Sequence, residues 1–442
     1  MTIKVVAAVD ENYNLLAAKD IKCPEDRVFF HEQIKNAIVI ASRTTSAEIP
    51  DRVRSLASEW IEVSSMNPVR NVILSKLKEN PNVTLVIAGG GIVYQNVIDD
   101  FASPNLEIIF TVISNRKGFV KLEVPNFKIR QEIELTKSAR IQIFNFCGQL
   151  NDTIYHDLMK KVLDNGELRR DRTGVGTISL FGESVKYSLE NGQIPLLTTK
   201  YLDFSKVMTE LLWFLSGSTN SKILEAQGVN IWKGNSSREF LDKTGLTHLK
   251  EGDIGAGYGF QWRHYGAEYI DSETDYTGKG VDQIKDLIEG LKNDPYSRRH
   301  MLLGWNPSDL KKMALPPCHC MCQFYVHTDN RLDCHLYQRS GDVFLGIPWN
   351  IASYAALTIM IAKLCDYKAG SLIHSLGDVH IYLNHKDAVQ EQLSRMPFKS
   401  PKLSIFPKSH EKSFFDEIDF SNLKWVLEDY IFHPRIKAQM AI

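Results

Sequence analysis

The stretch Met321-Cys-Gln-Phe-Tyr-Val-His-Thr-Asp-Asn-Arg-Leu-Asp-Cys-His-Leu-Tyr-Gln-Arg339 decides the fold of the second half of the chain. In its later part, Leu, Cys and Leu at positions 332, 334 and 336 alternate with Asp, His and Tyr. This alternation is typical of a β-strand with one face in the core and one polar face. Asp329 and Asn330 favour a turn. We therefore predict two strands, 321–326 and 331–339, joined at this turn.

Helical patterns surround these two strands. Residues 351–365 are apolar nearly all round, which predicts a buried central helix. Apolar residues form one stripe from Phe204 to Leu215, with Gly217 at the end. A third pattern repeats at Ile154, Leu158 and Val162, and Asn165-Gly166 supplies its stop. We expect a helix at each of these three places.

The first 150 residues have a different pattern. Short, nearly continuous apolar runs recur, with polar or helical stretches between them, at 3–9, 37–41, 83–88 and 106–113. Such runs are typical of an α/β domain with a mostly parallel sheet and flanking helices. The last strand-like run gives way to the helix-capping residues Asn151-Asp152-Thr153. We therefore predict two domains, residues 1–148 and 149–442.

Composition restricts the class of protein. A content of 43% hydrophobic and 24% charged residues matches an ordinary soluble globular protein of two or three domains. The net charge of −1 provides no bulk attraction to nucleic acid or to a membrane, so neither partner is expected. The N-terminus lacks a signal-peptide pattern, and no apolar run reaches roughly 20 residues without polar interruption. Seven scattered cysteines favour a reducing compartment, and we expect a cytoplasmic location.

Cys318 is the first residue that suggests chemistry, because it follows Pro316-Pro317 and precedes His319. A cysteine acts as a nucleophile only as thiolate, so it needs a cation, a helix N-terminus or a base beside it. Two other interpretations stay open. Cys318, Cys320 and Cys322 are also compatible with three small core residues. A zinc site is disfavoured, because alternate residues of a strand lack the chelating turn of such sites. No metal is expected.

Arginines form the second signal. A guanidinium group binds phosphate through two parallel hydrogen bonds, and a neighbouring hydroxyl adds a donor. The candidates are Arg172, Arg298, Arg299 and Arg339 with Ser340. Solvated surface arginines are the alternative. The turn Gly89-Gly90-Gly91 allows a pyrophosphate to approach backbone amides, although a tight packing turn has the same pattern. The residues alone therefore predict a cysteine nucleophile with a phosphate site and nothing more specific.

From about Tyr155 to Ile442 the sequence resembles thymidylate synthases over its whole length. The matching motifs, in order, are Asp171–Gly174, Pro195–Lys200, Glu210–Leu215, Tyr258–His264, Ser297–Arg299, Leu315–His319, Gln338–Asp342, Asn350–Tyr354 and His380–Tyr382. So many ordered matches make coincidence implausible. The resemblance implies an α+β thymidylate synthase fold and reductive methylation of deoxyuridylate (dUMP) to thymidylate, with 5,10-methylenetetrahydrofolate as co-substrate.

The same resemblance implies a role for each matched residue. Cys318 attacks C6 of deoxyuridylate and so activates the ring. Glu210, Tyr258 and His319 relay protons and order water around the ring. The implied deoxyuridylate-binding residues are Arg172, Arg298, Arg299, Gln338, Arg339, Ser340, Asn350, His380 and Tyr382. The implied folate-binding residues are Lys200, Trp232, Asp342 and Ile442. Arg298 and Arg299 resemble a pair that reaches in from a second subunit, which implies a homodimer and a positive charge that favours the Cys318 thiolate.

Three positions refine this expectation. Tyr201 stands where the family commonly has Arg, and Trp349 stands where Phe usually precedes the Asn, both near the expected folate side. The related deoxycytidylate hydroxymethylases carry Asp at the position of Asn350. An amide serves both the donor and the acceptor of uracil, so Asn350 favours uracil over cytosine. A folate- or nucleotide-binding protein without turnover is the remaining alternative for the whole chain.

Residues 2–146 resemble dihydrofolate reductase more loosely, so the complete chain is similar to bifunctional dihydrofolate reductase–thymidylate synthases. The implied reductase-like site consists of Asp26, Phe30, Arg52 and Thr111, and the implied NADPH contacts are Arg43, Gly89, Gly90 and Gly91. Several expected residues are lost: no Leu-Pro-Trp precedes Cys23, Ser42 and Ser46 replace Gly and Trp, and Arg27 replaces an apolar residue. Two hypotheses follow for this domain, an NADPH-dependent reductase or a scaffold and regulator of the synthase.

Overall fold

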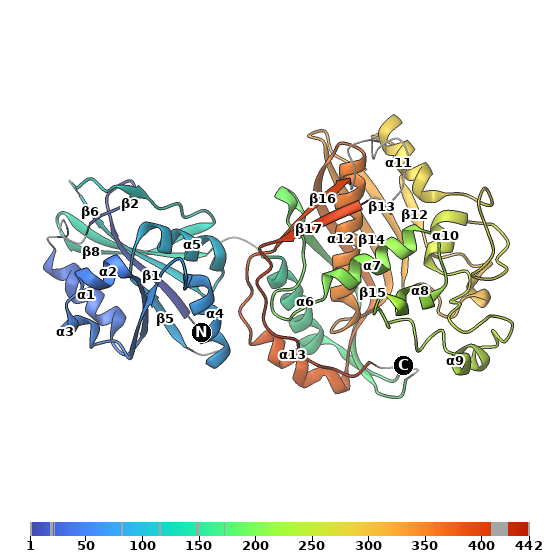
Figure 1. Ribbon diagram of the computed structural model, residues 1–442, viewed down its shortest axis with the longest axis horizontal. Helices are drawn as coiled ribbons and strands as arrows, with labels where there is room; N and C mark the ends of the chain where they lie inside the picture. Colours follow the sequence, from blue (N-terminus) through green and yellow to red (C-terminus); the bar gives the residue numbers. More distant parts are fainter. Residues whose placement is uncertain are drawn as a thin grey trace. The chain divides into compact units, whose positions relative to one another are not determined.

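The computed structural model describes residues 2–17, 21, 23–80, 83–114, 116–146, 150–171, 173–407 and 423–440. The chain divides into two compact units. The first consists of residues 1–150 together with 395–399, and the second consists of residues 151–394 and 400–442. The sequence placed one boundary after residue 148 and contained no signal for the short segment 395–399. Each unit has its own sheet (Figure 1).

The first unit is built on a mostly parallel sheet, as predicted (Figure 1). Its strands follow the order β4-β3-β5-β1-β6-β9-β8, and β2 and β7 pair beside β1. The neighbours from β4 to β6 are parallel, whereas β9 is antiparallel to both β6 and β8. The strands are β1 (Thr2–Val9), β2 (Asn14–Leu15), β3 (Ile38–Ser42), β4 (Glu59–Val63), β5 (Thr84–Ile87), β6 (Leu106–Ile113), β7 (Val120–Lys121), β8 (Phe127–Thr136) and β9 (Ala139–Phe146).

Helices complete this unit: α1 (Pro24–Ile34), α2 (Arg43–Glu48), α3 (Asp51–Arg54), α4 (Val69–Glu79) and α5 (Gly91–Phe101). Helix α1 begins at a proline. The N–H groups of the first turn have no acceptor within the helix, so proline costs no hydrogen bond there. Its Ile34 is fully buried in a core that also contains Val39 and Ile109. The last residue of α5, Phe101, packs edge-on against Phe398 of the segment 395–399, with the ring centroids 5.7 Å apart. This segment therefore contributes to the core of the first unit.

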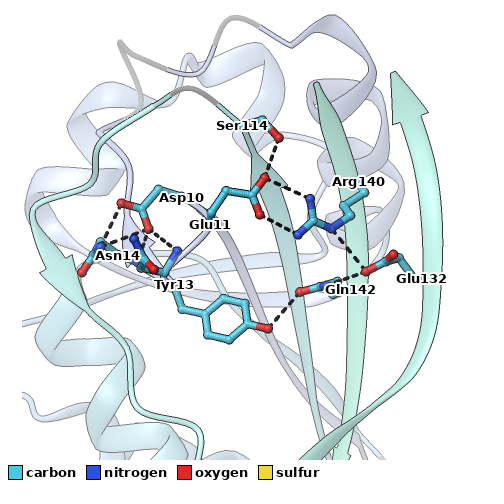
Figure 2. A network of polar contacts seen from close by, with 9 residues as sticks. Asp10, Glu11, Tyr13, Asn14, Ser114, Glu132, Arg140 and Gln142 are labelled. Atoms are coloured by element: carbon cyan, nitrogen blue, oxygen red, sulfur yellow. Dashed lines mark hydrogen bonds and ion pairs between the residues drawn. The ribbon is translucent and has the colours of Figure 1, made fainter. Parts of the chain in front are cut away.

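A polar network fixes the turn that leads out of β1 (Figure 2). The carboxylate of Asp10 accepts hydrogen bonds from the backbone N–H groups of Asn12 (2.8 Å), Asn14 (2.9 Å) and Gly118 (3.0 Å). Burial on its own raises the pKa of Asp10, but the hydrogen bonds from Gly118, Asn14 and Asn12 outweigh that effect and lower the pKa to about 2. Asp10 therefore stays ionised at neutral pH and holds the turn closed.

The same turn is also tied to β9, the strand two places along the sheet. Glu11 pairs with Arg140 at 2.7 Å, and the Tyr13 hydroxyl donates to Gln142 at 3.2 Å (Figure 2). Tyr13 has a φ of 62°, a backbone conformation that a bulky residue adopts only when its surroundings enforce it. The network thus supplies the contacts that hold this strained residue in place.

The sheet of the second unit follows the order β10-β11-β15-β14-β13-β12 (Figure 1). All its neighbouring strands are antiparallel except β14 and β15, which are parallel. The strands are β10 (Glu167–Arg169), β11 (Thr177–Ser188), β12 (Met301–Leu303), β13 (His319–Val326), β14 (Arg331–Asp342) and β15 (Lys368–Tyr382). A separate hairpin pairs β16 (Lys402–Pro407) with β17 (Leu423–Glu428). The predicted strand pair is the antiparallel hairpin β13–β14, with Asn330 at φ 64° in its turn.

One detail of the predicted alternation in β14 is wrong. Leu332, Cys334 and Leu336 are fully buried as expected. However, Asp333, which was predicted on the polar face, is only 6% exposed and lies 3.2 Å from His327. The pairing of β14 with β15 is irregular at this point, and Gly370 opposite provides the space that the Asp333 carboxylate occupies. The carboxylate therefore turns inward.

The helices of this unit are α6 (Asn151–Asn165), α7 (Phe204–Leu215), α8 (Ser221–Ala226), α9 (Arg238–Lys243), α10 (Tyr258–His264), α11 (Gln283–Asn293), α12 (Gly346–Leu364) and α13 (Lys386–Leu393). Helix α12 packs on β14 and β15, and α7 packs on both α12 and α10 (Figure 1). By length and composition α12 is apolar enough to cross a membrane, but 83% of its apolar stretch is buried inside the protein. It is therefore the central core helix that the sequence predicted.

Candidate active site

A cavity of about 1330 Å³ opens in the second unit. Its lining comes from helices α7, α9, α10 and the start of α12, from strands β10, β11, β14 and β15, and from the loops between β10 and β11, between α8 and α9, and before β13. The residues predicted from the sequence that line it are Glu210, Trp232, Tyr258, Cys318, His319, Gln338, Arg339, Ser340, Asp342, Asn350, His380 and Tyr382. The fold therefore brings together side chains that are up to 172 positions apart in the chain.

Cys318 lies in this cavity beside a guanidinium group. The Nη2 of Arg339 is 3.8 Å from the Cys318 Sγ, and the backbone N–H of Cys318 donates to the Tyr258 hydroxyl at 2.8 Å. Arg339 is held in place by the carbonyl oxygens of Pro316 (2.8 Å) and Pro317 (2.9 Å). Burial raises the pKa of the Cys318 thiol, and the positive charge of Arg339 opposes that increase. Arg339 of the same chain therefore favours the thiolate. Arg298 and Arg299, which the sequence suggests for the same effect, are expected to come from a second subunit.

The neighbouring cysteines have other environments. Cys322 is buried in the core with Cys334, and the thiol of Cys320 lies 3.6 Å from the Cys318 carbonyl oxygen. The hypothesis of three core cysteines thus applies to Cys322 but not to Cys318. Within the part of the chain that the structure describes, no three His, Cys, Asp or Glu side chains are grouped in a way that could hold a metal ion.

Glu210 is an acidic residue on the buried face of α7, where it is only 5% exposed. Each of its carboxylate oxygens accepts a hydrogen bond from an indole: Oε1 from Trp232 at 2.7 Å and Oε2 from Trp349 at 2.5 Å. Burial raises the pKa of Glu210 to about 7, although both indole hydrogen bonds oppose the increase. Near neutral pH this group can therefore both accept and donate a proton, which suits general acid–base chemistry.

The side chains of His319 and Tyr258 are neutral at neutral pH. Burial lowers the pKa of His319 to about 4, despite a hydrogen bond with Asn350. Burial, together with the nearby Cys318, raises the pKa of Tyr258 well above its ordinary value. Gln338 donates to the Asn350 Oδ1 at 3.0 Å, so the amide of Asn350 is fixed in one orientation. These groups therefore act as fixed hydrogen-bonding partners.

An aspartate that the sequence analysis missed orients His380. The Nδ1 of His380 lies 2.8 Å from Asp378, and the other oxygen of Asp378 pairs with Arg169 at 2.7 Å. The hydrogen bond with His380 lowers the pKa of Asp378 and outweighs the effect of burial. The ring of Tyr382 stands edge-on to His380 at 5.2 Å. The sequence does contain a signal for this contact. Asp378 stands two residues before His380, and residues two apart on a strand share one face.

Several predicted residues do not line the described cavity. Arg298 and Arg299 are exposed on the surface. Lys200 is buried, with its ammonium group 3.5 Å from the centre of the Phe344 ring. Tyr201 lies in an aromatic cluster of the C-terminal segment, 4.7 Å from Phe432 between ring centroids. Arg172 and Ile442 lie outside the described residues.

The reductase-like residues belong to the first unit. Burial raises the pKa of Asp26 on α1, and a hydrogen bond from Thr111 on β6 opposes that increase. Phe30 is half-buried on α1 next to the core, and Arg43 and Arg52 are exposed.

The glycine turn before α5 is closely packed. A Cβ on Gly89 would lie 2.4 Å from the Thr45 hydroxyl, and one on Gly91 would lie 2.8 Å from Val120. Gly90 has a φ of 75°, which favours glycine. This turn needs glycine for packing whether or not it binds a nucleotide.

Comparisons with known proteins agree with this geometry. Residues 153–442 match the thymidylate synthase family. The chain is 50% identical to the thymidylate synthase of Candida albicans over 306 residues, which cover 65% of this chain and 96% of that protein. It is 46% identical to the bifunctional dihydrofolate reductase-thymidylate synthase of Zea mays over 334 residues, or 74% of this chain and 63% of that protein. The bifunctional protein of Leishmania major is 50% identical over 289 residues, and the chain spans 55% of its length. The chain belongs to the thymidylate synthase family.

Proposed function

We propose that the second unit methylates deoxyuridylate reductively to thymidylate, with 5,10-methylenetetrahydrofolate as co-substrate. The observation that carries this proposal is the position of Cys318. Its thiol faces a cavity next to the Arg339 guanidinium, and the same cavity contains Glu210 with a pKa of about 7. A nucleophile, a cation that stabilises its thiolate and a proton carrier are thus available to one bound nucleotide.

In this mechanism the Cys318 thiolate forms a bond to C6 of the uracil ring, and an electron pair moves from the C5–C6 double bond toward O4. The resulting enolate makes C5 nucleophilic. Covalent addition thus divides a difficult substitution at a vinylic carbon into easier steps. Asn350, fixed by Gln338, binds the polar edge of the base, and His380, fixed by Asp378, binds the sugar. Glu210 exchanges protons with the ring or its ordered water.

The cavity also fits a flat, bicyclic folate ring. Apolar and aromatic side chains line the same cavity as Cys318: Phe214, Ile231, Trp232, Leu345 and Trp349. Asp342, in the same lining, supplies a carboxylate for the hydrogen-bond donors of such a ring. The folate supplies both the one-carbon group and the hydride when it is bound. The aromatic wall orients the ring and excludes water from the reacting carbon.

A homodimer through the second unit is part of this proposal. Helix α12 covers one face of the sheet, while the opposite face exposes aromatic and apolar side chains of the hairpin β13–β14. Met321 is 42% exposed, Tyr325 58% and Tyr337 38%. An uncovered patch of this kind is typical of an interface, and a second copy of the chain is its proposed partner. Arg298 and Arg299, exposed on each subunit, then bind the phosphate of the nucleotide in the other subunit.

A cytoplasmic location is proposed from the cysteine usage alone.

A second candidate function belongs to the first unit. Half-buried Asp26, hydrogen-bonded to Thr111, favours a reductase that transfers hydride from NADPH to dihydrofolate. The alternative is the scaffold hypothesis, in which the glycine turn serves only to pack against Thr45 and Val120. The folate product formed in the presence of NADPH distinguishes the two: tetrahydrofolate for the reductase, dihydrofolate for the scaffold.

Replacement of the nucleophile tests the principal proposal. Cys318→Ala should abolish thymidylate formation while deoxyuridylate still binds, because the remaining nucleotide contacts are intact. Cys320→Ala is the matched control: it lies two residues away, does not line the cavity and should keep activity within about twofold. Substantial turnover by Cys318→Ala, measured as labelled thymidylate, would remove Cys318 from this role.

A further inference from the structure

Trp349 occupies a position where related enzymes usually carry phenylalanine, and in this chain it contacts a catalytic group. We propose that Trp349 is a positioning residue whose indole N–H holds the second oxygen of the Glu210 carboxylate, so that the carboxylate is fixed between two indoles. This inference rests on the proposed function, because it concerns the proton carrier of that reaction. It assigns a task to a side chain that the sequence placed only near the expected folate side.

The geometry of the contact comes from three separate elements. Glu210 lies on α7, Trp232 lies in the segment between α8 and α9, and Trp349 lies near the start of α12. The two hydrogen bonds, of 2.7 Å and 2.5 Å, reach different oxygens of the carboxylate. Together they restrict rotation of the carboxylate about its terminal bond. One donor alone would hold only one of the two oxygens.

A phenylalanine at position 349 would fill most of the same space but has no N–H group. The Oε2 atom of Glu210 would then lose the one donor that the described residues provide for it. A buried oxygen without a donor is costly, particularly when it carries charge. Trp349 therefore stabilises the ionised form of Glu210 more than a phenylalanine would.

Among the described residues, the Trp349 N–H donates to Glu210 and to no other ionisable side chain of the cavity. Those other side chains come from β10 and the loop after it, from α9 and α10, from the start of β13, and from β14 and β15. They are Arg169, Arg170, Asp171, Lys243, Tyr258, Cys318, His319, Arg339, Asp342, Asp378, His380 and Tyr382. Tyr258 and His319 are neutral near pH 7, as described above. Loss of the Trp349 N–H should therefore raise the pKa of Glu210, because the ionised form loses a hydrogen bond.

Trp349→Phe tests this inference, and Trp213→Phe is its matched control. Trp213 is 4% exposed on α7, and its ring centroid lies 6.3 Å from that of Trp232. Its indole nitrogen has no hydrogen-bond partner among the described residues. Both variants lose similar volume and one N–H, but only Trp349→Phe loses a bonded one. The acid limb of the kcat–pH profile should move upward by about one to two pH units in Trp349→Phe. The KM for deoxyuridylate should stay within about twofold, and Trp213→Phe should keep the wild-type profile.

A measurement without substrates separates this inference from the proposed function. The carbonyl stretch of protonated Glu210 can be followed by infrared difference titration of the resting protein, with Glu210→Gln to identify the band. A higher midpoint in Trp349→Phe, and no change in Trp213→Phe, would support the inference even if wild-type protein made no thymidylate. Should Trp349→Phe fail to fold, β-(3-benzothienyl)alanine at position 349 keeps the shape of the indole without its N–H. An unchanged midpoint, or an equal change in the control, would overturn the inference.

Discussion

Glu210→Gln should make the stability of the second unit less dependent on pH. The folded-state pKa of Glu210 is about 7, whereas the ordinary value is 4.5. As the pH falls, the folded protein therefore binds this proton before the unfolded protein does. The stabilisation that results is fully present below about pH 4.5, and it is lost as the pH rises through 7. Glutamine at this position cannot titrate, so the variant lacks this contribution.

The size of the effect follows from the same pKa values. Raising a pKa from 4.5 to about 7 corresponds to about 3 kcal/mol. Most of this, about 2–3 kcal/mol, falls between pH 5 and pH 8. The difference in unfolding free energy between variant and wild type should change by this amount across that range, in favour of the variant at the higher pH. The unfolding free energy of the variant should also differ from that of wild type by an amount that does not vary with pH. The reason is that the amide N–H₂ group and one of the two indole N–H groups are both donors and cannot hydrogen-bond to each other.

Urea unfolding followed by tryptophan fluorescence measures this difference. Six of the seven tryptophans, from Trp213 to Trp425, belong to the second unit, so the signal reports mainly on it. Glu289→Gln is the control, because Glu289 is exposed on α11 and should give parallel curves. A Glu210→Gln curve that also runs parallel to wild type between pH 5 and pH 8 would refute the perturbed titration of Glu210, and with it the assigned role as proton carrier.

Three further predictions concern other parts of the second unit. The buried carboxylate of Asp152 accepts four hydrogen bonds from two buried threonines, so Asp152→Ala should cost about 2–4 kcal/mol in the same urea assay, and a loss below about 1 kcal/mol would contradict that role. Asn350→Asp should lower the preference for deoxyuridylate over deoxycytidylate by about tenfold or more in kcat/KM, since a carboxylate accepts a hydrogen bond from the amino group of cytosine; an unchanged ratio would remove Asn350 from base selection. Mixing Arg299→Ala subunits with Cys318→Ala subunits should restore about a quarter of wild-type activity if each site is shared across the dimer, whereas mixtures as inactive as their parents would count against sharing.

Periodic patterns predicted the elements that frame the site. The alternation in β14, except at Asp333, recurs in the structure, and so do the apolar stripe of α7 and the all-round apolar surface of α12. Each of these elements buries one defined face or its whole surface. The hairpin β8–β9 was not predicted. Strand β8 lies at the sheet edge and is exposed along most of its length, so its sequence has little burial pattern to detect. The segment 395–399 is too short to show any period.

The site was predicted by resemblance rather than by pattern. Spacing and composition pointed only to Cys318 and a set of arginines. The bond between Trp349 and Glu210 joins residues 139 positions apart, and no rule of spacing connects two helices that are so distant in sequence. The same is true of Arg339, whose position beside the Cys318 thiol depends on the carbonyl oxygens of two prolines. Contacts of this kind depend on the complete fold.

One reaction tests the central claim most directly. Wild-type protein is incubated with deoxyuridylate, 5,10-methylenetetrahydrofolate and NADPH, and the nucleotide and folate products are identified by mass spectrometry. We expect thymidylate as the nucleotide product under either hypothesis for the first unit. Dihydrofolate with unconsumed NADPH would assign the first unit to the scaffold hypothesis, and tetrahydrofolate with oxidised NADPH would assign it to the reductase. Absence of thymidylate under conditions in which deoxyuridylate binds would contradict the account.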